Sequence, residues 1–373
     1  MKIPDNTIKQ LWTALAASAM LVLSINCMAQ PKTNVANRWL DSAEPTPELV
    51  IPATRPAWEA DRKELRSLLW QRLGTFPARP IRPEVRMLQR ENRGDYFLEK
   101  FEFEDGLGAV VPGYLLLPRI VVGKAPAVLY CHWHGGQYDI GKEELFRTNA
   151  LPVPPGPELV RRGYVVMAID ACGFGERNGQ GPGGAAEKGG AGELTAGKFN
   201  LWLGRTLWGM IVRDDLMALD YLSARPEVDP ARIGVTGISM GSTRTWWILA
   251  LDDRPRTGVG ICCLTRYQNL IREEGLHYHG IYYFVPGMLR DFDTEAVVAL
   301  AAPRPMLFLS GEMDGGSPPD GIRIIESKVL PAYRLYGAES DFVSVLYPGV
   351  GHQYTPTMWA RTLEWLDHRL KHK

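Results

Sequence analysis

The sequence predicts an α/β fold in which a mostly parallel central sheet is flanked by helices and preceded by an antiparallel extension. From about residue 125 onward, short apolar runs of strand length alternate with segments of helical periodicity. These runs are apolar throughout, as in strands that are buried on both faces of a parallel sheet. Residues 85–118 instead contain alternating stretches such as YFLEKFEFE and VVPGYLLLP, which are typical of antiparallel strands.

Composition limits the partners of the chain. It has 373 residues, 45% of them hydrophobic, which is enough for one large α/β domain with a substantial core. Lysine plus arginine and aspartate plus glutamate balance at 42 each, so no net charge attracts nucleic acid or an anionic membrane. We therefore expect no nucleic acid as partner and no membrane span in the mature chain; a small molecule or a glycan as partner is implied only by the family resemblance given below. Composition does not predict the oligomeric state.

Residues 1–29 are predicted to be a signal peptide. Lys2 and Lys9 flank a polar start, and an apolar stretch over 11–25 ends shortly before a small residue, alanine. This stretch is shorter than the roughly 20 residues that a membrane-spanning helix needs. The mature protein is thus expected in the periplasm or outside the cell. Lipid attachment at Cys27 is the alternative, although the two residues before it are larger than such sites prefer.

The remaining elements follow in chain order. Residues 30–57 are a lead-in rich in proline, with several threonines and asparagines and little periodicity, and 58–373 are predicted to form a single domain. Within it we expect a helix and antiparallel strands over 58–120, a catalytic core over 121–373 and a cap-like segment over about 264–293. The predicted buried strands are 126–132, 164–170, 232–237, 258–263, 305–310 and 342–348, and the predicted helices are 58–73, 206–223, 240–251 and 358–370.

Two segments interrupt the alternation of strands and helices. Residues 173–197 are rich in glycine but lack the GxxxxGK[ST] and GxGxxG patterns of nucleotide-binding loops, so we predict a long loop and no cofactor. Residues 264–293 carry several tyrosines and histidines and are a candidate substrate wall.

The sequence Gly-Ile-Ser239-Met-Gly lies between a predicted strand and a predicted helix. A sharp turn in that context raises the serine above the sheet edge and is the arrangement of a nucleophile elbow. A GxSxG pattern alone is weak, because a glycine-rich chain of this length produces one by chance with odds on the order of 0.1–0.2. The strand–turn–helix context is what makes Ser239 the predicted nucleophile.

A serine hydroxyl needs a base to remove its proton. His352, in the stretch YPGVGHQY directly after the last predicted strand, is the candidate base. An acid that orients this histidine is expected after the preceding strand, where SGEMDGGSPPD offers Glu312, Asp314 and Asp320. Asp314 is favoured because it lies in a G-x-x-D stretch a few residues past the strand end.

Acyl transfer also needs hydrogen-bond donors for the oxyanion that develops on the carbonyl. The backbone N–H of Met240, directly after the candidate nucleophile, is one predicted donor. The sequence HWHGG after the first parallel strand resembles an HG-type oxyanion motif, and the amide of Gly136 is the predicted second donor.

Metal binding is the competing interpretation of the same loop. His132 and His134 would share one face of a strand, and His277 and His279 repeat their spacing, but no third ligand is implied. We therefore predict no metal. Cys131, Cys172, Cys262 and Cys263 show no metal or disulfide-framework spacing, and buried free thiols are expected, with one disulfide as the alternative.

The stretch from about residue 125 to the end resembles the α/β-hydrolase superfamily, in its bacterial branch of acetyl-xylan-esterase-like and prolyl-oligopeptidase-like, dienelactone-hydrolase-related domains. The similar stretches are HWHGG, AIDACGFGER, DPARIGVTGISMGS, APRPMLFLSGEMD and GVGHQY. The resemblance implies an exported serine carboxylic-ester hydrolase that removes acyl or methyl esters from a carbohydrate. Arg177, Arg266 and Trp208 are candidate substrate-binding residues.

Two alternatives come from other functional classes. A peptidase of the prolyl-oligopeptidase type is disfavoured because fewer than a hundred residues stand between the predicted signal peptide and the first hydrolase strand, too few for the propeller that gates such enzymes. A non-catalytic binding protein on a hydrolase scaffold normally lacks a member of the triad, whereas Ser239, His352 and Asp314 are all present.

Overall fold

The computed structural model describes residues 34–80 and 83–371. The chain divides into two compact units, residues 1–43 and 44–373. In the first unit, helix α2 (Val35–Asp41) begins after Asn34, whose side-chain oxygen accepts a hydrogen bond from the amide of Asn37. This helix lies in the lead-in that the sequence predicted to be irregular. The predicted signal peptide lies outside the described residues.

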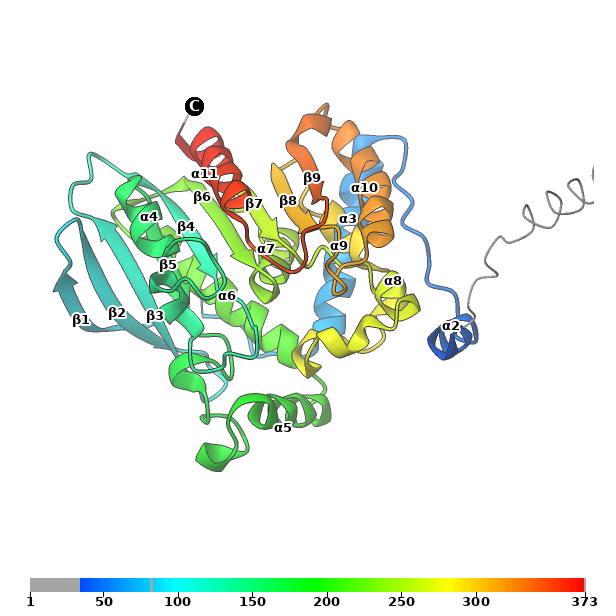
Figure 1. Cartoon of the computed structure of the whole chain (residues 1–373), viewed down its shortest axis with the longest axis horizontal. Coiled ribbons are helices and arrows are strands. Elements are labelled where there is room, and N and C mark those ends of the chain that lie inside the picture. Colours follow the sequence, from blue (N-terminus) through cyan, green and yellow to red (C-terminus); the bar gives the residue numbers. More distant parts are fainter. Residues whose placement is uncertain (1–33, 81–82, 372–373) are drawn as a thin grey trace, which may run out of the picture. The chain divides into compact units, whose positions relative to one another are not determined.

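One sheet organises the second unit, and its described strands follow the order β1-β2-β3-β5-β4-β6-β7-β8-β9 (Figure 1). The pairs at the start of this order, from β1 to β5, are antiparallel. All pairs from β5 through β4 to β9 are parallel. This confirms the predicted mostly parallel sheet with an antiparallel start. The strands are β1 (Val85–Asn92), β2 (Tyr96–Glu104), β3 (Val110–Pro118), β4 (Ala125–Cys131), β5 (Val165–Ile169), β6 (Val228–Ile238), β7 (Thr257–Ile261), β8 (Met306–Gly311) and β9 (Phe342–Tyr347).

Helices cover both faces of the sheet, each over its own apolar cluster. One face carries α3 (Arg55–Leu73), α6 (Leu207–Ala224), α7 (Met240–Leu251), α9 (Thr294–Ala299) and α10 (Pro319–Arg334). The other face carries α4 (Pro155–Arg161) and α11 (Pro356–Lys371). Among the described residues, no helix has the length and apolar character needed to cross a membrane.

The glycine-rich segment departs from its prediction. Its second half is not a loop but the start of helix α5 (Gly189–Trp202). Tertiary packing stabilises this helix despite its glycines, because Ala196 and Asn200 are buried. At Gly197 a side chain would meet Ile281 at 2.9 Å, so glycine is what allows α5 to pack this closely.

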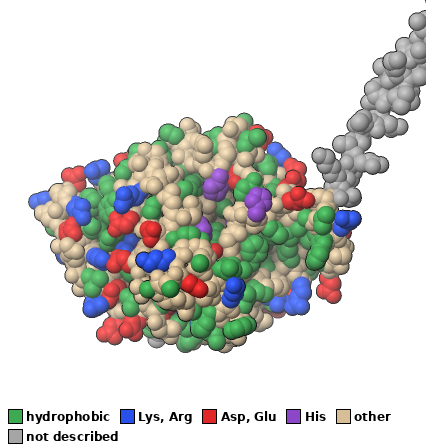
Figure 2. Space-filling model, turned by 60° about the horizontal axis from the view of Figure 1, so that its bottom comes forward, with side chains coloured by type: hydrophobic (Ala, Val, Ile, Leu, Met, Phe, Trp, Pro, Cys, Tyr) green, Lys and Arg blue, Asp and Glu red, His purple; other side chains and the backbone are tan. Residues whose placement is uncertain are grey.

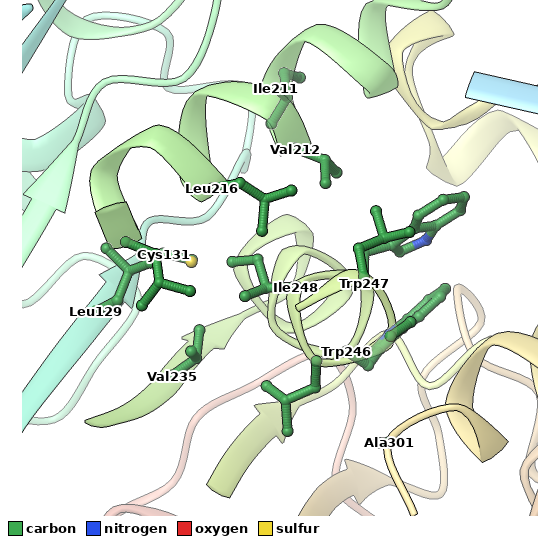
Figure 3. Packing of buried hydrophobic residues seen from close by; sticks show 14 of the residues in the cluster. Leu129, Cys131, Ile211, Val212, Leu216, Val235, Trp246, Trp247, Ile248 and Ala301 are labelled. Carbon is green, nitrogen blue, oxygen red and sulfur yellow. The ribbon is translucent and has the colours of Figure 1, made fainter. Parts of the chain in front are cut away.

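Helix α7 is buried over its whole length, its serine and threonines included. Figure 3 shows Trp246, Trp247 and Ile248 of α7 packed among side chains of α6 and the central strands. The helix also buries Arg244, whose guanidinium donates to both carboxylate oxygens of Asp215 on α6, at 2.9 and 2.5 Å. The helix that follows Ser239 is therefore held rigidly against the sheet.

Candidate active site

Ser239 occupies the turn between β6 and α7. Its backbone lies in the left-handed region, with φ 60° and ψ −119°, which a non-glycine residue adopts only under constraint. The constraint comes from β4, because a side chain at Gly237 would lie 2.2 Å, and one at Gly241 2.0 Å, from the carbonyl oxygen of Cys131. The two glycines let the turn approach β4 closely, which is the geometry of a nucleophile elbow.

Asp314 and His352 meet at the same edge of the sheet. Asp314 follows β8, His352 follows the neighbouring strand β9, and their Oδ2 and Nδ1 atoms are 2.8 Å apart. The other carboxylate oxygen of Asp314 accepts the amide of Gly316 at 3.0 Å. Because Asp314 is 3% exposed and bonded through both oxygens, its carboxylate is fixed against the imidazole.

The two rejected acids lie elsewhere. Glu312 is exposed, and the side chain of Asp320 is 84% exposed on α10, where it pairs with Arg323. Of the three candidates, only Asp314 has a hydrogen bond to His352 among the described contacts.

Two cysteines after β7 lie beside Ser239, Asp314 and His352. Cys262 and Cys263 both have left-handed backbones, with φ 60° and 50°. The sulfur of Cys263 lies 3.8 Å from the hydroxyl oxygen of Ser239, and that of Cys262 lies within 4.8 Å of the nearest ligand atoms of Asp314 and His352. Burial raises the pKa of both thiols, which disfavours the thiolate form that a nucleophile needs. All four cysteines among the described residues are free.

His132, one of the histidines of the metal alternative, has both ring nitrogens engaged. Its Nε2 accepts the amide of Ala171 at 3.0 Å, and its Nδ1 donates to the carbonyl of Trp133 at 2.8 Å. Burial lowers the pKa of this imidazole well below its ordinary value, so it stays neutral. No lone pair is left for a metal, and the side chain braces the loop after β4.

His134 forms a second, separate network in the same loop. Its Nε2 lies 2.7 Å from a carboxylate oxygen of Glu193 on α5, and its Nδ1 accepts the amide of Gly136 at 3.1 Å. The amide of Gly136, the predicted second oxyanion donor, thus bonds within its own loop in this structure. Met240, the predicted first donor, is the first residue of α7.

The 264–293 segment contacts the loop after β8 that carries Asp314. Its described elements are α8 (Tyr267–Arg272), η4 (Gly275–Tyr278), η5 (Ile281–Tyr283) and η6 (Met288–Arg290). His279 stacks on Tyr283, with ring centroids 3.9 Å apart, and its Nε2 donates to the carbonyl of Gly316 at 3.3 Å. Burial lowers the pKa of His279 to about 4, so this ring is neutral near neutral pH. In Figure 2 histidine side chains, drawn in purple, gather on one face of the molecule.

The three candidate substrate-binding residues are held by the protein itself. Arg177 is 4% exposed and donates to Asp214 at 2.7 Å, and Arg266 pairs with Glu295 at 3.1 Å. Trp208 is 1% exposed and packs under Tyr282. The described contacts do not bring any of the three to Ser239.

Sequence reasoning missed two carboxylates that shape the site. Glu193 lies in the segment predicted to be a loop, so nothing in the sequence pointed it at His134. Glu144 is buried in a short 3-10 helix (Gly141–Phe146), where it accepts the hydroxyl of Tyr130 at 2.5 Å and the amide of Trp133 at 3.0 Å. Neither contact has a signal in the sequence, because a glutamate in a polar stretch normally faces solvent.

An elbow serine, a buried Asp–His pair and a mostly parallel sheet with helices on both faces define an α/β-hydrolase. The chain belongs to the Abhydrolase family, whose model matches residues 31–318. It is 37% identical over 309 residues to the protein named "Putative hydrolase YtaP" of Bacillus subtilis (strain 168), covering 82% of this chain and 99% of that protein. The resemblance and the hydrolase class predicted from the sequence are thereby confirmed.

Solved structures share the fold at lower identity. A "putative acetyl xylan esterase" from Bacteroides fragilis NCTC 9343 has a TM-score of 0.69 at 20% identity, over 89% of this chain and 94% of that one. A glucuronoyl esterase from Solibacter usitatus has a TM-score of 0.66 at 17% identity, over 87% and 99% of the two chains. At these identities the likeness concerns the fold alone.

Proposed function

We propose that the protein is an exported serine carboxylic-ester hydrolase that removes acyl or methyl esters from a carbohydrate. The observation that carries the proposal is the 2.8 Å hydrogen bond between buried Asp314 and His352, at the same sheet edge as the strained Ser239. A nucleophile, a base and an acid that orients the base are the minimum set for acyl transfer through a covalent intermediate.

The reaction would proceed in two steps. His352 takes the proton of Ser239 through Nε2 while the serine oxygen attacks the ester carbonyl, and the oxyanion binds the amide of Met240. Collapse breaks the bond to the alcohol oxygen, which receives the proton from His352. The same histidine then activates a water that hydrolyses the acyl-enzyme. If Gly136 supplies the second donor, its amide must first give up its hydrogen bond to the ring of His134 and then donate to the oxyanion.

The carbohydrate part rests on similarity and chemistry together. Several structures with the same fold bear the names of acetyl xylan and glucuronoyl esterases. The wall formed by the 264–293 segment exposes Tyr278, at 58%, and Phe284, at 39%. Flat aromatic surfaces beside a few polar groups suit ligands with both apolar and polar faces.

The test is hydrolysis of p-nitrophenyl esters from acetate to octanoate, alongside acetylated xylan and methyl-esterified pectin. We expect turnover of short esters and of at least one glycan, and its loss in Ser239→Ala. Near-wild-type hydrolysis by that variant would contradict the assignment of Ser239 as the nucleophile. Absence of hydrolysis of every ester would favour a peptidase, to be tested with aminoacyl-nitroanilides.

A distant relative, "Uncharacterized peptidase YuxL" of Bacillus subtilis (strain 168), is 23% identical over 274 residues, and the match spans 36% of its length.

A further inference from the structure

Gly316, in the loop after β8, is held through both of its backbone groups. Its N–H donates to Oδ1 of Asp314 at 3.0 Å. Its carbonyl accepts hydrogen bonds from the hydroxyl of Thr265 at 2.8 Å and from Nε2 of His279 at 3.3 Å. Gly315 and Gly316 give this stretch of chain wide conformational freedom, because neither carries a Cβ. The direction of the N–H that reaches Asp314 is therefore set by contacts from outside the loop.

Thr265 makes the shorter of these two outside contacts, and its own position is fixed. It lies shortly after β7 and is 0% exposed. Its hydroxyl, which donates to the carbonyl of Gly316, lies 2.9 Å from the hydroxyl of Ser317. Its carbonyl accepts the hydroxyl of Thr294, the first residue of α9, at 2.5 Å. A buried threonine whose hydroxyl and carbonyl are both bonded is a rigid anchor for the neighbouring loop.

Asp293 ties the two ends of the 264–293 segment together beside this anchor. Its buried carboxylate accepts the amides of Tyr267 at 2.8 Å and Gln268 at 3.0 Å. It also accepts the amide of Thr294 at 2.7 Å. The chain that follows Thr265 is thus bound to the start of α9, so it does not move with the loop after β8.

Thr265 has no direct route to a substrate. Its side chain is closed off from solvent, and its hydroxyl bonds Gly316 and Ser317 in the described contacts. Any effect on catalysis has to pass through Gly316, which supplies one of the two hydrogen bonds that orient the carboxylate of Asp314. The other hydrogen bond joins Asp314 to His352, so a carboxylate that turns away from Gly316 also loses its alignment with the base.

We propose that Thr265 is a positioning residue of the hydrolase. Through the backbone of Gly316 it holds the carboxylate of Asp314 against His352. His279 supports the same carbonyl by a longer hydrogen bond, so part of the alignment survives when the threonine is replaced. The inference rests on the proposed function, because it requires the serine, the base and the acid to act together. Loss of the Thr265 hydroxyl should then slow acyl transfer for every ester alike and leave ester binding unchanged.

The test compares three replacements of Thr265 in the full-length protein. Thr265→Val removes the hydroxyl and keeps the shape, Thr265→Ala removes it without placing a methyl group against the carbonyl of Gly316, and Thr265→Ser keeps it. We expect the first two to lower kcat for p-nitrophenyl acetate about tenfold, with KM within about twofold of wild type. Thr265→Ser should retain kcat within about threefold.

Thr257→Val is the matched control, because it also removes a buried threonine hydroxyl that donates to a backbone carbonyl. That hydroxyl bonds Pro305 at 2.7 Å from the opposite end of β7, away from the site. Its kcat should match that of the wild type.

A double-mutant cycle separates positioning from a purely structural role. In an Asp314→Ala background no carboxylate is left to orient, so adding Thr265→Val should change kcat by less than about twofold. The same cycle is measured on the rate at which a fluorophosphonate probe labels Ser239, followed by intact mass. Labelling needs the activated serine but no ester substrate. Failure of the wild type to hydrolyse any ester would therefore count against the proposed function, and labelling would still decide the role of Thr265.

Three results would overturn the proposal. The first is a kcat and a labelling rate of Thr265→Val and Thr265→Ala within about twofold of wild type. The second is an equal loss in Thr265→Ser. The third is a further loss of about tenfold when Thr265→Val is added to Asp314→Ala. Urea denaturation shows whether each variant is folded, and if Thr265→Val is not, the results of Thr265→Ala decide.

Discussion

Replacing Asp314 by asparagine tests the catalytic assignment, because the structure dictates which way the new amide must point. One carboxylate oxygen of Asp314 accepts the amide of Gly316 at 3.0 Å, and the other faces Nδ1 of His352 at 2.8 Å. In Asp314→Asn the oxygen has to stay opposite Gly316, since an NH₂ group there would oppose another donor. The NH₂ group then faces Nδ1 of His352 and donates to it.

That contact selects the wrong tautomer. With Nδ1 as acceptor, the proton of neutral His352 sits on Nε2, which can no longer take the proton of Ser239. Inverting the tautomer in a triad of this type costs about 10⁴-fold in kcat, which corresponds to about 5.5 kcal/mol of transition-state stabilisation. The assay is p-nitrophenyl acetate hydrolysis at pH 7, with circular dichroism to show that the variant folds.

Asp320→Asn is the matched control, because it makes the same chemical change on an exposed side chain in the first turn of α10, a short distance further along the chain. We expect its kcat to stay within about twofold of wild type, as for substitutions remote from the chemistry. If Asp314→Asn retains more than a tenth of wild-type kcat, Asp314 does not orient the base. A loss that appears instead in Glu312→Gln would move the role to that residue.

Three further changes test the framework of the site. Gly241→Ala should reduce activity at least a hundredfold or prevent folding, because its Cβ would lie 2.0 Å from a carbonyl oxygen of β4; esterase assay and soluble yield measure this. Asp215→Ala should cost about 3–5 kcal/mol in urea denaturation, since it leaves the fully buried Arg244 without its partner. Burial raises the pKa of Glu144 to about 7, so its contribution to stability is fully present below about pH 4.5 and is lost as the pH rises through 7. Glu144→Gln should therefore remove a decline of about 3 kcal/mol across that window.

The changes at Gly241 and Asp215 each have a control in the same chain. Gly181→Ala should be neutral for folding, because nothing lies within 4 Å of its added carbon. Asp229→Ala breaks a half-exposed pair with Arg232 and should cost less than about 1 kcal/mol. A cost for Asp215→Ala that is no larger than this would contradict the importance of the buried pair. A stability curve of Glu144→Gln that still falls between pH 4.5 and 7 would show that another group causes the decline.

Much of the fold was predictable because its elements have local signals. Helix α7 spans the predicted residues 240–251, and the ends of the predicted central strands fall within a few residues of the observed ones, since parallel strands buried on both faces are apolar runs bounded by polar residues. Helix α5 was missed because its glycine content is typical of a loop. Its packing against α6 and Ile281 is what stabilises the helix. Helix α10 was also not predicted, although its apolar residues recur at helical spacing; Pro331 lies within it.

The sequence by itself determined the sheet, the elbow at Ser239 and the choice of Asp314 and His352, because each follows from a position relative to a strand end. Tertiary structure alone decided which side chains surround them. Glu193 reaches His134 from 59 residues away, and the neighbouring Cys263 places its sulfur against Ser239. The same holds for Arg177, which the sequence offered as a substrate ligand and the fold placed in a buried ion pair. Such contacts depend on how elements distant in sequence pack, and a local pattern carries no information about that packing.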